Sequence, residues 1–360
     1  MKPTIVLIAG LVASALAVSM VFGGAARAIL AVDDANNRVL MFSAETGELV
    51  REVVAASGEL SGPMSVAPGP TVVQNDQTFS RTVLVGDIRR RRVAMFDELS
   101  GAFLREWVAG VDASGLLKVD NEWLLAGARA GVMAISSSGV ATTRIAPEIV
   151  LGPNNSWSVL HRPATESRAA DILVSDATLD VILRFDPSGA RLGVFARRGE
   201  FRFTQQLALR AGGNVLVADP LANRVFEFDD AGGFVRAIVC AHPRGVAELT
   251  GGNLLIASDD GVQVFESVNG TSLATTLAGL PANAVRNLAV VSCSGLAGDL
   301  NGDGRVNAFD IDPFVLALTD ESAFAEQFPM IDRFCAGDIN RDDHLNSFDI
   351  DPFVALLVGG

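Results

Sequence analysis

The feature that most limits how this 360-residue chain can fold is a segment that recurs through its first three quarters. In four copies an aspartate precedes a phenylalanine by nine residues: Asp33 and Phe42, Asp87 and Phe96, Asp176 and Phe185, Asp219 and Phe228. Two weaker copies, WLLAGARAGVMAI from Trp123 and LLIASDDGVQVF from Leu254, bring the number of units to six. A period of about 40 to 54 residues is typical of architectures that repeat one small unit.

Each unit has the period-two apolar alternation of β-strands, and convincing helical periodicity is absent from them. Two such strands and a glycine turn are followed by a third apolar stretch, for example LVREVV or RLGVFA. A further short strand precedes five of the units: MSVAP, LLKVD, SVLHR, QLALR and GVAEL. A unit of four strands is the size of one β-propeller blade.

The strand count also accounts for the ends of this region. The first unit begins at Ile29 and lacks a leading strand, while a spare strand, RNLAVV from Arg286, follows the sixth unit. We expect this spare strand to complete the first blade and close the ring, because closure removes an unpaired sheet edge. The fold class predicted is therefore mainly β, with a six-bladed propeller over residues 29–295.

The units resemble NHL-type repeats, in which valine-x-aspartate is followed by asparagine-arginine-valine and then phenylalanine. AVDDANNRVLMF and VADPLANRVFEF match best, through Asn37-Arg38-Val39 and Asn223-Arg224-Val225. The resemblance covers most of residues 29–295 and implies a propeller. We interpret the repeated aspartate as structural, accepting backbone N–H bonds in the turn after its strand. The repeated phenylalanine is interpreted as core between blades.

The first 28 residues are interpreted as a secretory signal peptide. Lys2 supplies a positive start, residues 4–22 are almost all apolar, and Ala26-Arg27-Ala28 fits a small-x-small cleavage site. The alternative is a membrane anchor, which Ser14, Ser19 and a glycine pair disfavour. We therefore expect a secreted or cell-surface protein that begins near Ile29 and has no membrane span after cleavage.

A short acidic phrase appears twice at the end of the chain, as DLNGDGRVNAFD from Asp299 and DINRDDHLNSFD from Asp338. The spacing matches an EF-hand-like loop, whose alternating oxygen donors bind calcium. The first set of ligands would be Asp299, Asn301, Asp303, the Arg305 carbonyl, Asn307 and Asp310. The second would be Asp338, Asn340, Asp342, the His344 carbonyl, Asn346 and Asp349. Because Asp343 replaces Gly304 at the sharp turn, we predict two calcium ions, the second bound more weakly.

After each loop comes Pro-Phe-Val and an apolar run suited to a short helix, and Asp320 is a candidate N-cap for a linking helix. Residues 296–360 resemble a dockerin type I module, and we expect them to form a small α-helical calcium-binding domain. The resemblance implies paired loop-helix units that fold with calcium and attach the chain to another protein. Ala308-Phe309 and Ser347-Phe348 depart from the small hydroxyl residues usual at those positions, so the phenylalanines are either core or an exposed docking pair.

Charge and cysteine content limit the partners. From Leu296 onward the chain has 13 acidic and 3 basic residues, a net charge of −10, which disfavours nucleic acid and suits a divalent cation. Three cysteines are too few for a disulfide framework. Our preferred pairing is Cys293 with Cys335, because each precedes one acidic phrase, but other pairings with Cys240 and three unpaired thiols stay open.

No catalytic residue can be assigned: the motifs of nucleophile elbows and zinc sites are absent from the sequence. Equivalent positions on the inner strands are predicted to meet near one end of the channel: Pro68, Lys118, His161, Arg210, Glu248 and Val290. Lys118, His161 and Arg210 would form a basic arc for an anionic ligand, with solvated strand ends as the alternative. The sequence thus favours a secreted binding or scaffold protein over an extracellular propeller enzyme of the lyase or lactonase type.

Overall fold

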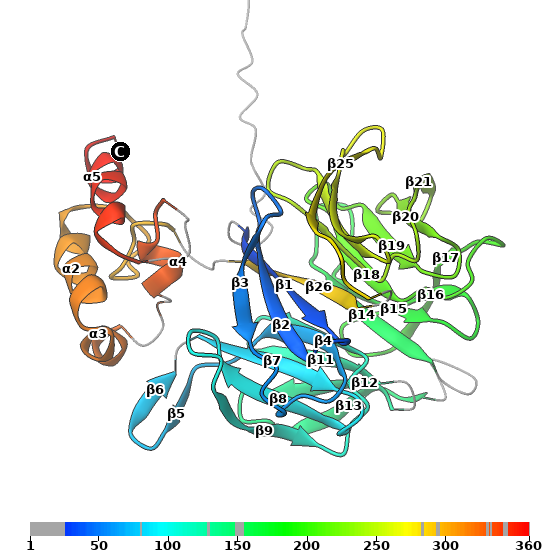
Figure 1. Cartoon of the computed structure of the whole chain (residues 1–360), viewed down its shortest axis with the longest axis horizontal. Helices are drawn as coiled ribbons and strands as arrows, with labels where there is room; N and C mark the ends of the chain where they lie inside the picture. Colours follow the sequence, from blue (N-terminus) through cyan, green and yellow to red (C-terminus); the bar gives the residue numbers. More distant parts are fainter. Residues whose placement is uncertain are drawn as a thin grey trace, which may run out of the picture.

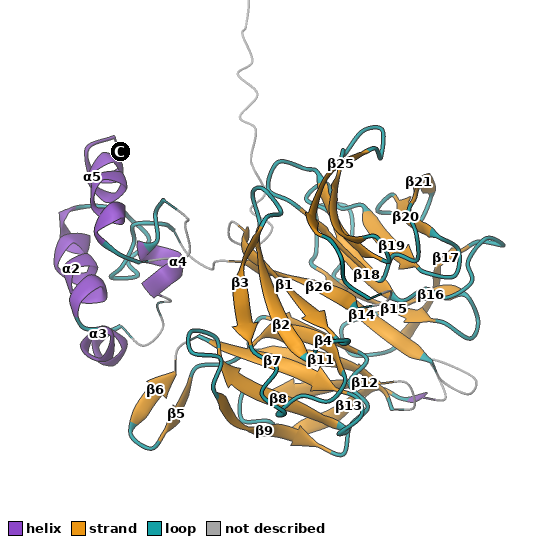
Figure 2. Cartoon of the chain, in the orientation of Figure 1, coloured by secondary structure: helices purple, strands orange, loops and turns teal. Residues whose placement is uncertain are grey.

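The computed structural model describes residues 26–79, 81–127, 130–147, 155–281, 284–292, 296–328, 331, 333–340 and 345–359. In these residues the sheets comprise six four-stranded blades and one two-stranded hairpin, with short helices following them at the C-terminal end (Figures 1 and 2). The chain is mainly β, as predicted, and its sheets form a six-bladed propeller.

The blades follow one another in chain order, apart from the first. The first three are β26 (Val285–Ser292), β1 (Ala26–Asp33), β2 (Arg38–Ser43) and β3 (Leu49–Val54); then β4 (Pro63–Pro68), β7 (Thr82–Asp87), β8 (Arg92–Asp97) and β9 (Phe103–Ala109); then β10 (Gly115–Val119), β11 (Glu122–Gly127), β12 (Gly131–Ser136) and β13 (Ala141–Ile145). The last three are β14 (Ser156–Arg162), β15 (Asp171–Asp176), β16 (Val181–Phe185) and β17 (Arg191–Arg197); then β18 (Gln206–Leu209), β19 (Val215–Asp219), β20 (Arg224–Phe228) and β21 (Phe234–Val239); then β22 (Gly245–Glu248), β23 (Leu254–Ser258), β24 (Gly261–Phe265) and β25 (Ser272–Leu277).

The ring closes through its C-terminal strand, which confirms the prediction made from the strand count. β26 pairs antiparallel with β1 as the inner strand of the first blade, with Ala289 opposite Leu30. The inner strands β26, β4, β10, β14, β18 and β22 then contact one another in sequence and return to β26. β1 begins at Ala26, three residues before the start that the sequence suggested for the propeller.

The repeated aspartate is buried at the end of the second strand of its blade and organises the turn that follows. Asp219, for example, accepts N–H bonds from Arg202, Phe203 and Ala222 at 2.8, 3.0 and 2.9 Å. Asp33, Asp87 and Asp176 likewise accept backbone N–H groups, and all four are fully buried. Four residues after each aspartate the backbone is left-handed, at Asn37, Arg91, Asp180 and Asn223. Asparagine tolerates this conformation, which explains its place in the repeat.

The repeated phenylalanines are core, as predicted, and they lie between neighbouring blades. Phe96 packs with Leu30 and Val53 of the first blade, and Phe228 packs with Leu160 and Leu173 of the fourth. Phe42 and Phe185 are also fully buried, within the clusters that join blades six to one and three to four. Each blade therefore buries its apolar face against the next one, and the ring has one core for each neighbouring pair.

A small hairpin interrupts the second blade between its first and second strands. β5 (Val72–Gln74) pairs with β6 (Gln77–Phe79), and the turn residues Asn75 and Asp76 both have positive φ. Figure 1 shows the hairpin extending from the propeller on the side where the C-terminal helices lie. The sequence analysis did not predict this hairpin.

The C-terminal segment forms two loop-helix units around a small core. These are η1 (Ala308–Asp310) with α2 (Ile311–Thr319), and η2 (Ser347–Asp349) with α5 (Ile350–Gly359), joined by α3 (Glu321–Gln327) and α4 (Arg333–Gly337). The rings of Phe314 and Phe353, from equivalent positions, stack at 4.1 Å between centroids. Asp320 caps α3 by accepting the Ala323 N–H, as predicted.

Cys335 is disulfide-bonded, and Cys240 is a buried free thiol. Cys293, the partner that the sequence suggested for Cys335, lies outside the described residues, as does most of the proposed signal peptide. Among the described helices, none has both the length and the apolar character needed to cross a bilayer.

Candidate functional site

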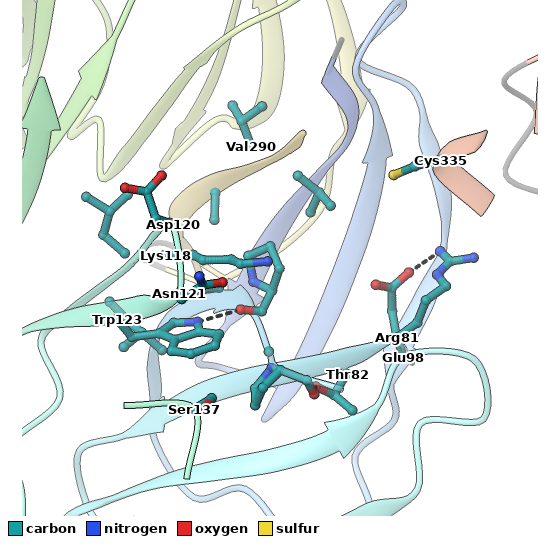
Figure 3. Close-up of a pocket in the computed structure, with 18 of the residues that line it drawn as sticks. Arg81, Thr82, Glu98, Lys118, Asp120, Asn121, Trp123, Ser137, Val290 and Cys335 are labelled. Atoms are coloured by element: carbon teal, nitrogen blue, oxygen red, sulfur yellow. Dashed lines mark hydrogen bonds and ion pairs between the residues drawn. The ribbon is translucent and has the colours of Figure 1, made fainter. Parts of the chain in front are cut away.

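A cavity of about 1210 Å³ runs along the propeller channel and extends towards the C-terminal helices. It is lined along the inner strands, from Gly115, Ser158 and Gln206 near their beginnings to the residues at their ends, and by turns that follow them. Pro68, Lys118, His161, Glu248 and Val290, which the sequence placed at equivalent blade positions, all line it. Figure 3 shows Lys118, Asp120 and Asn121 gathered on one side of this cavity, with Arg81, Glu98 and Cys335 on the other.

Polar side chains near the beginnings of the inner strands form hydrogen bonds between blades at one end of this cavity. Gln206 accepts the N–H groups of Val246 and Leu288 at 3.0 and 3.1 Å and donates to the Leu288 carbonyl at 2.8 Å. Ser158 Oγ accepts the Leu207 N–H at 3.1 Å, and Asn287 Oδ1 accepts the Val66 N–H at 3.2 Å. The bonds from Gln206 to Val246, from Ser158 and from Asn287 join neighbouring blades, whereas those between Gln206 and Leu288 reach from blade five to blade one. Ser158, Gln206 and Asn287 line the cavity and form its floor.

The walls above this floor are largely apolar. Leu117, Ala208, Leu209 and Ala289 are half-buried, and Val290 is exposed at the mouth. The Trp123 side chain is buried beneath Lys118 and donates its indole N–H to the Pro68 carbonyl at 2.7 Å. Apolar walls with polar groups placed at the floor and rim are a common form of small-molecule site.

The basic arc predicted from the sequence is wrong for Arg210, whose charge is paired with carboxylates and which is not among the residues that line the cavity. Its guanidinium donates to Glu248 at 2.7 Å, to Glu227 at 2.9 Å and to the Gly252 carbonyl at 2.9 Å. Glu248 in turn also accepts the Ala211 N–H at 2.5 Å. These bonds and carboxylates raise the pKa of Arg210 even though its burial acts in the opposite direction. Arg210 and Glu248 therefore join blades five and six.

Four polar side chains at the cavity rim are uncommitted: Lys118, Asp120, Asn121 and His161. In the part of the chain that the structure describes, none of them makes a side-chain hydrogen bond or ion pair. Lys118, Asp120 and Asn121 are exposed, while His161 is half-buried. Burial lowers the pKa of His161, and the nearby Asp120 opposes this only in part, so the imidazole is neutral at pH 7.

Asp120 and Asn121 were not among the residues predicted from the sequence. They form the tight turn between β10 and β11, where Asp120 has a φ of 49°. The signal that identifies them is the dipeptide Asp-Asn between two apolar runs, which is typical of such a turn. Because only Val119 separates Lys118 from this turn, all three side chains reach the same rim.

The far side of the cavity is formed with the C-terminal helices. Arg81 and Glu98 form an ion pair there, and both are buried. The Arg81 guanidinium also lies over the ring of Phe334, in α4, at 4.0 Å from its centroid. Phe324, Phe328 and Cys335 of the same module line the cavity.

The first acidic loop is organised by its aspartates. Asp299 accepts the N–H groups of Gly302, Asp303 and Gly304 at 2.8, 3.1 and 2.8 Å. Asp310 accepts those of Leu300, Asn301 and Asn307 at 2.9, 3.1 and 2.9 Å. Gly304 has a φ of 84°, as the predicted sharp turn requires.

The second loop repeats this pattern where it is described. Asp349 accepts the N–H groups of Ile339, Asn340 and Asn346 at 2.8, 3.2 and 2.9 Å. Asn307 and Asn346 each cap the helix that follows by accepting a phenylalanine N–H at 2.8 Å. The proposed ligands Asp342 and His344 lie outside the described residues.

Two further observations bear on a metal in these loops. Among the described residues, no three side chains of His, Cys, Asp or Glu converge as a group that could hold a metal. The proposed sets, however, draw half of their donors from asparagine side chains and a backbone carbonyl.

The phenylalanines of the two loops are exposed and are not core: Phe309 and Phe348 are 78% and 75% exposed.

Comparison with known proteins supports the fold alone. No protein-family model and no curated protein matches the chain. A chain in a crystal structure of a nidogen–laminin complex is 12% identical, with a TM-score of 0.57 over 74% of this chain and 98% of that one. A protein of unknown function from Bacteroides caccae is 14% identical, with a TM-score of 0.50 over 74% and 99%. A catalytically inactive variant of virginiamycin B lyase from Staphylococcus aureus, with quinupristin, is 11% identical, with a TM-score of 0.46 over 62% and 74%.

Proposed function

We propose that this chain is a secreted, non-enzymatic binding protein with two functional parts. The propeller, of the NHL type, is a rigid platform for a ligand or protein partner. The dockerin-like module at residues 296–360 binds two calcium ions and attaches the protein to another extracellular or cell-surface protein.

The observation that carries the calcium proposal is a set of buried carboxylates without a cation. Asp310 and Asp349 are fully buried and Asp299 is 8% exposed. Within the described residues, no lysine, arginine or histidine forms an ion pair with any of the three. In each carboxylate Oδ1 accepts two backbone N–H bonds and Oδ2 accepts one, which leaves a lone pair of Oδ2 for a metal. A buried carboxylate is costly unless it is paired, and calcium would supply the missing charge.

The donor types fit calcium, which prefers carboxylate, amide and carbonyl oxygens. Asp299, Asn301, Asp303, the Arg305 carbonyl, Asn307 and Asp310 would hold the first ion. Asp338, Asn340, Asp342, the His344 carbonyl, Asn346 and Asp349 would hold the second. When bound, calcium neutralises the acidic loops and links each one to the helix that follows it.

The exposed pair Phe309 and Phe348 supports an attachment role. Large aromatic side chains are seldom exposed on a monomer without a binding role when apolar neighbours extend the patch. Ile311 and Val315 beside Phe309, and Ile350 and Val354 beside Phe348, are between 42% and 51% exposed. Each loop-helix unit therefore offers the same apolar surface to a partner.

Calorimetry on the full chain tests the calcium proposal. Two unequal sites are expected, the tighter one lost in Asp299→Asn and the weaker one in Asp338→Asn, with Asp76→Asn on the β5–β6 hairpin as the control. The calcium proposal would be rejected by a single site, by no site, or by two sites that neither Asp299→Asn nor Asp338→Asn affects. Attachment is tested by capture from the outer fraction of the source cells, which should fail in chelator and in the Phe309→Ser, Phe348→Ser double variant.

An extracellular lyase or lactonase is the second candidate, and one residue favours it. His161 is a neutral, uncommitted imidazole at the cavity rim, as a general base requires. Glu248, which would have to join it, is held by Arg210. Turnover of a sugar or lactone that disappears in His161→Gln, with binding unchanged, would establish the enzymatic function.

A further inference from the structure

The uncommitted rim residues differ from the other charged groups of the propeller. Most arginines described in the structure have a carboxylate or carbonyl partner, as Arg210, Arg162 and Arg184 illustrate. Lys118, the only lysine after Lys2, has no carboxylate or carbonyl partner among the described residues; its ammonium lies 6.0 Å from the ring centroid of Trp123 and reaches into the cavity. A cation at a cavity rim that no carboxylate of the described residues neutralises is suited to an anionic group on a ligand.

Asp120 limits what that anionic ligand can be. Its exposed carboxylate lies two residues from Lys118 and lines the same cavity. A ligand with an anion and an aliphatic chain would leave Asp120 without a donor and would place two negative charges near each other. A phosphate would meet one lysine and one opposing carboxylate, whereas phosphate sites gather several cations or helix N-termini.

Hydroxyl groups on the ligand remove this conflict. A carboxylate side chain accepts hydrogen bonds from hydroxyls, an amide such as Asn121 both donates and accepts, and a neutral imidazole such as His161 does the same. The apolar walls at Leu117, Leu209 and Ala289 suit the C–H faces of a ring. The cavity volume of about 1210 Å³ exceeds what one drug-sized ligand needs, which leaves room for more than one sugar unit.

We propose that the cavity is a binding site for a hydroxylated carboxylate, namely a sugar acid or a short chain of sugar acids. Lys118 binds the carboxylate, and Asp120, Asn121 and His161 bind the hydroxyls. This inference deepens the binding role proposed for the propeller and rests on it, but it does not depend on calcium or on the attachment partner.

Titration calorimetry with the full chain tests the proposal, using three probes at equal concentration. The galacturonic acid trimer should bind, the neutral galactose trimer should bind at least about tenfold more weakly, and octanoate should bind no better than the galactose trimer. Lys118→Met should weaken binding of the acidic trimer by at least about tenfold, to the affinity of the neutral trimer, because a charge-assisted hydrogen bond is lost. Asp120→Asn should weaken binding of both trimers. The control Asp76→Asn should change binding of neither.

The outcomes separate this proposal from the previous one. Equal binding of the acidic and neutral trimers, no binding of either, or tighter binding of octanoate would overturn the sugar-acid assignment. Lys118 is exposed, so Lys118→Met should keep the thermal midpoint and the calcium titration of the unchanged chain. Calcium binding without trimer binding would reject only this inference, whereas trimer binding without calcium binding would reject only the attachment role.

Discussion

The guanidinium of Arg81, in the second blade, lies 4.0 Å from the ring centroid of Phe334, in the C-terminal helix α4. Such a cation–π contact contributes roughly 0.5–2 kcal/mol, and it connects two parts of the chain with separate cores. Phe334 is 7% exposed, and α4 leads directly into the second acidic loop. This ring is therefore one of the contacts that hold the C-terminal module beside the cavity.

Phe334→Leu should loosen the C-terminal module from the propeller without unfolding either part. Leucine keeps apolar contact but loses the π face that attracts Arg81. Small-angle X-ray scattering should report a larger radius of gyration than for the unchanged chain. Phe309→Leu, which changes a ring that is 78% exposed, is the control and should leave the radius unaltered. An unchanged radius in Phe334→Leu would show that other contacts fix the module.

Gln206→Leu should strongly destabilise the propeller. The amide satisfies two N–H groups and one carbonyl of blades six and one, and the side chain is 5% exposed. Leucine has a similar volume but would leave these three backbone groups unsatisfied, at about 1–3 kcal/mol each. Urea unfolding should give a loss of at least about 3 kcal/mol. The control Gln263→Leu, on the outer strands of blade six, should change stability by less than about 0.5 kcal/mol.

Gly232→Ala should destabilise the fifth blade, whereas Gly251→Ala should not. Gly232 has a φ of 90°, and an added Cβ would lie 2.1 Å from the Phe195 carbonyl of the fourth blade. The backbone strain alone costs about 1–3 kcal/mol, and the clash adds to it. Gly251 has no atom within 4 Å of the same position and no positive φ. Equal thermal midpoints for the two variants would contradict this explanation of the glycine turn.

The repeats made the propeller predictable because local and long-range requirements coincide in them. Asp219 organises a turn, Phe228 fills the space between blades, and the left-handed Asn223 lies between them, so one short motif encodes all three. The closing strand followed from counting strands alone. The β5–β6 hairpin was missed because it is an insertion outside the period, although Asn75-Asp76 is a typical hairpin turn.

The candidate site was less predictable than the fold. Blade equivalence brought Lys118, His161 and Glu248 to one cavity, but it could not show that Glu227 and Glu248 neutralise Arg210. That pairing depends on residues 17 and 38 positions away, in two different strands. Repeat periodicity determines which end of a strand a side chain occupies, whereas its partners depend on residues outside the motif.

Cys240 should be unreactive in the native protein. The side chain is 8% exposed, and burial raises the pKa of its thiol to about 12, so almost no thiolate forms at pH 8. A chromogenic disulfide reagent should therefore titrate no thiol in the native protein. In denaturant it should titrate one thiol, because Cys335 is disulfide-bonded, and three after reduction. Rapid native reaction would show that Cys240 is accessible, and three thiols without reduction would exclude the disulfide.

His161 should make the propeller less stable in mild acid. Burial, the dominant effect, and Arg168 lower the pKa of His161 below its ordinary value of 6.5, while Asp120, Asp171 and Glu122 oppose the shift. The unfolded chain therefore binds a proton at a higher pH than the folded chain does. Stability from this residue is complete above pH 6.5 and is lost as the pH falls towards the folded pKa.

Urea unfolding at pH 7.5 and pH 5.5 measures this effect. The unchanged protein should lose more stability between these two pH values than His161→Gln does, since glutamine cannot take up the proton. His242→Gln is the control. It keeps His161, so between the two pH values it should still lose the part of the unfolding free energy that His161 contributes. An imidazole titration by NMR gives the direct test, because a His161 midpoint above 6.5 would contradict both the sign and the neutral imidazole assigned to the cavity rim.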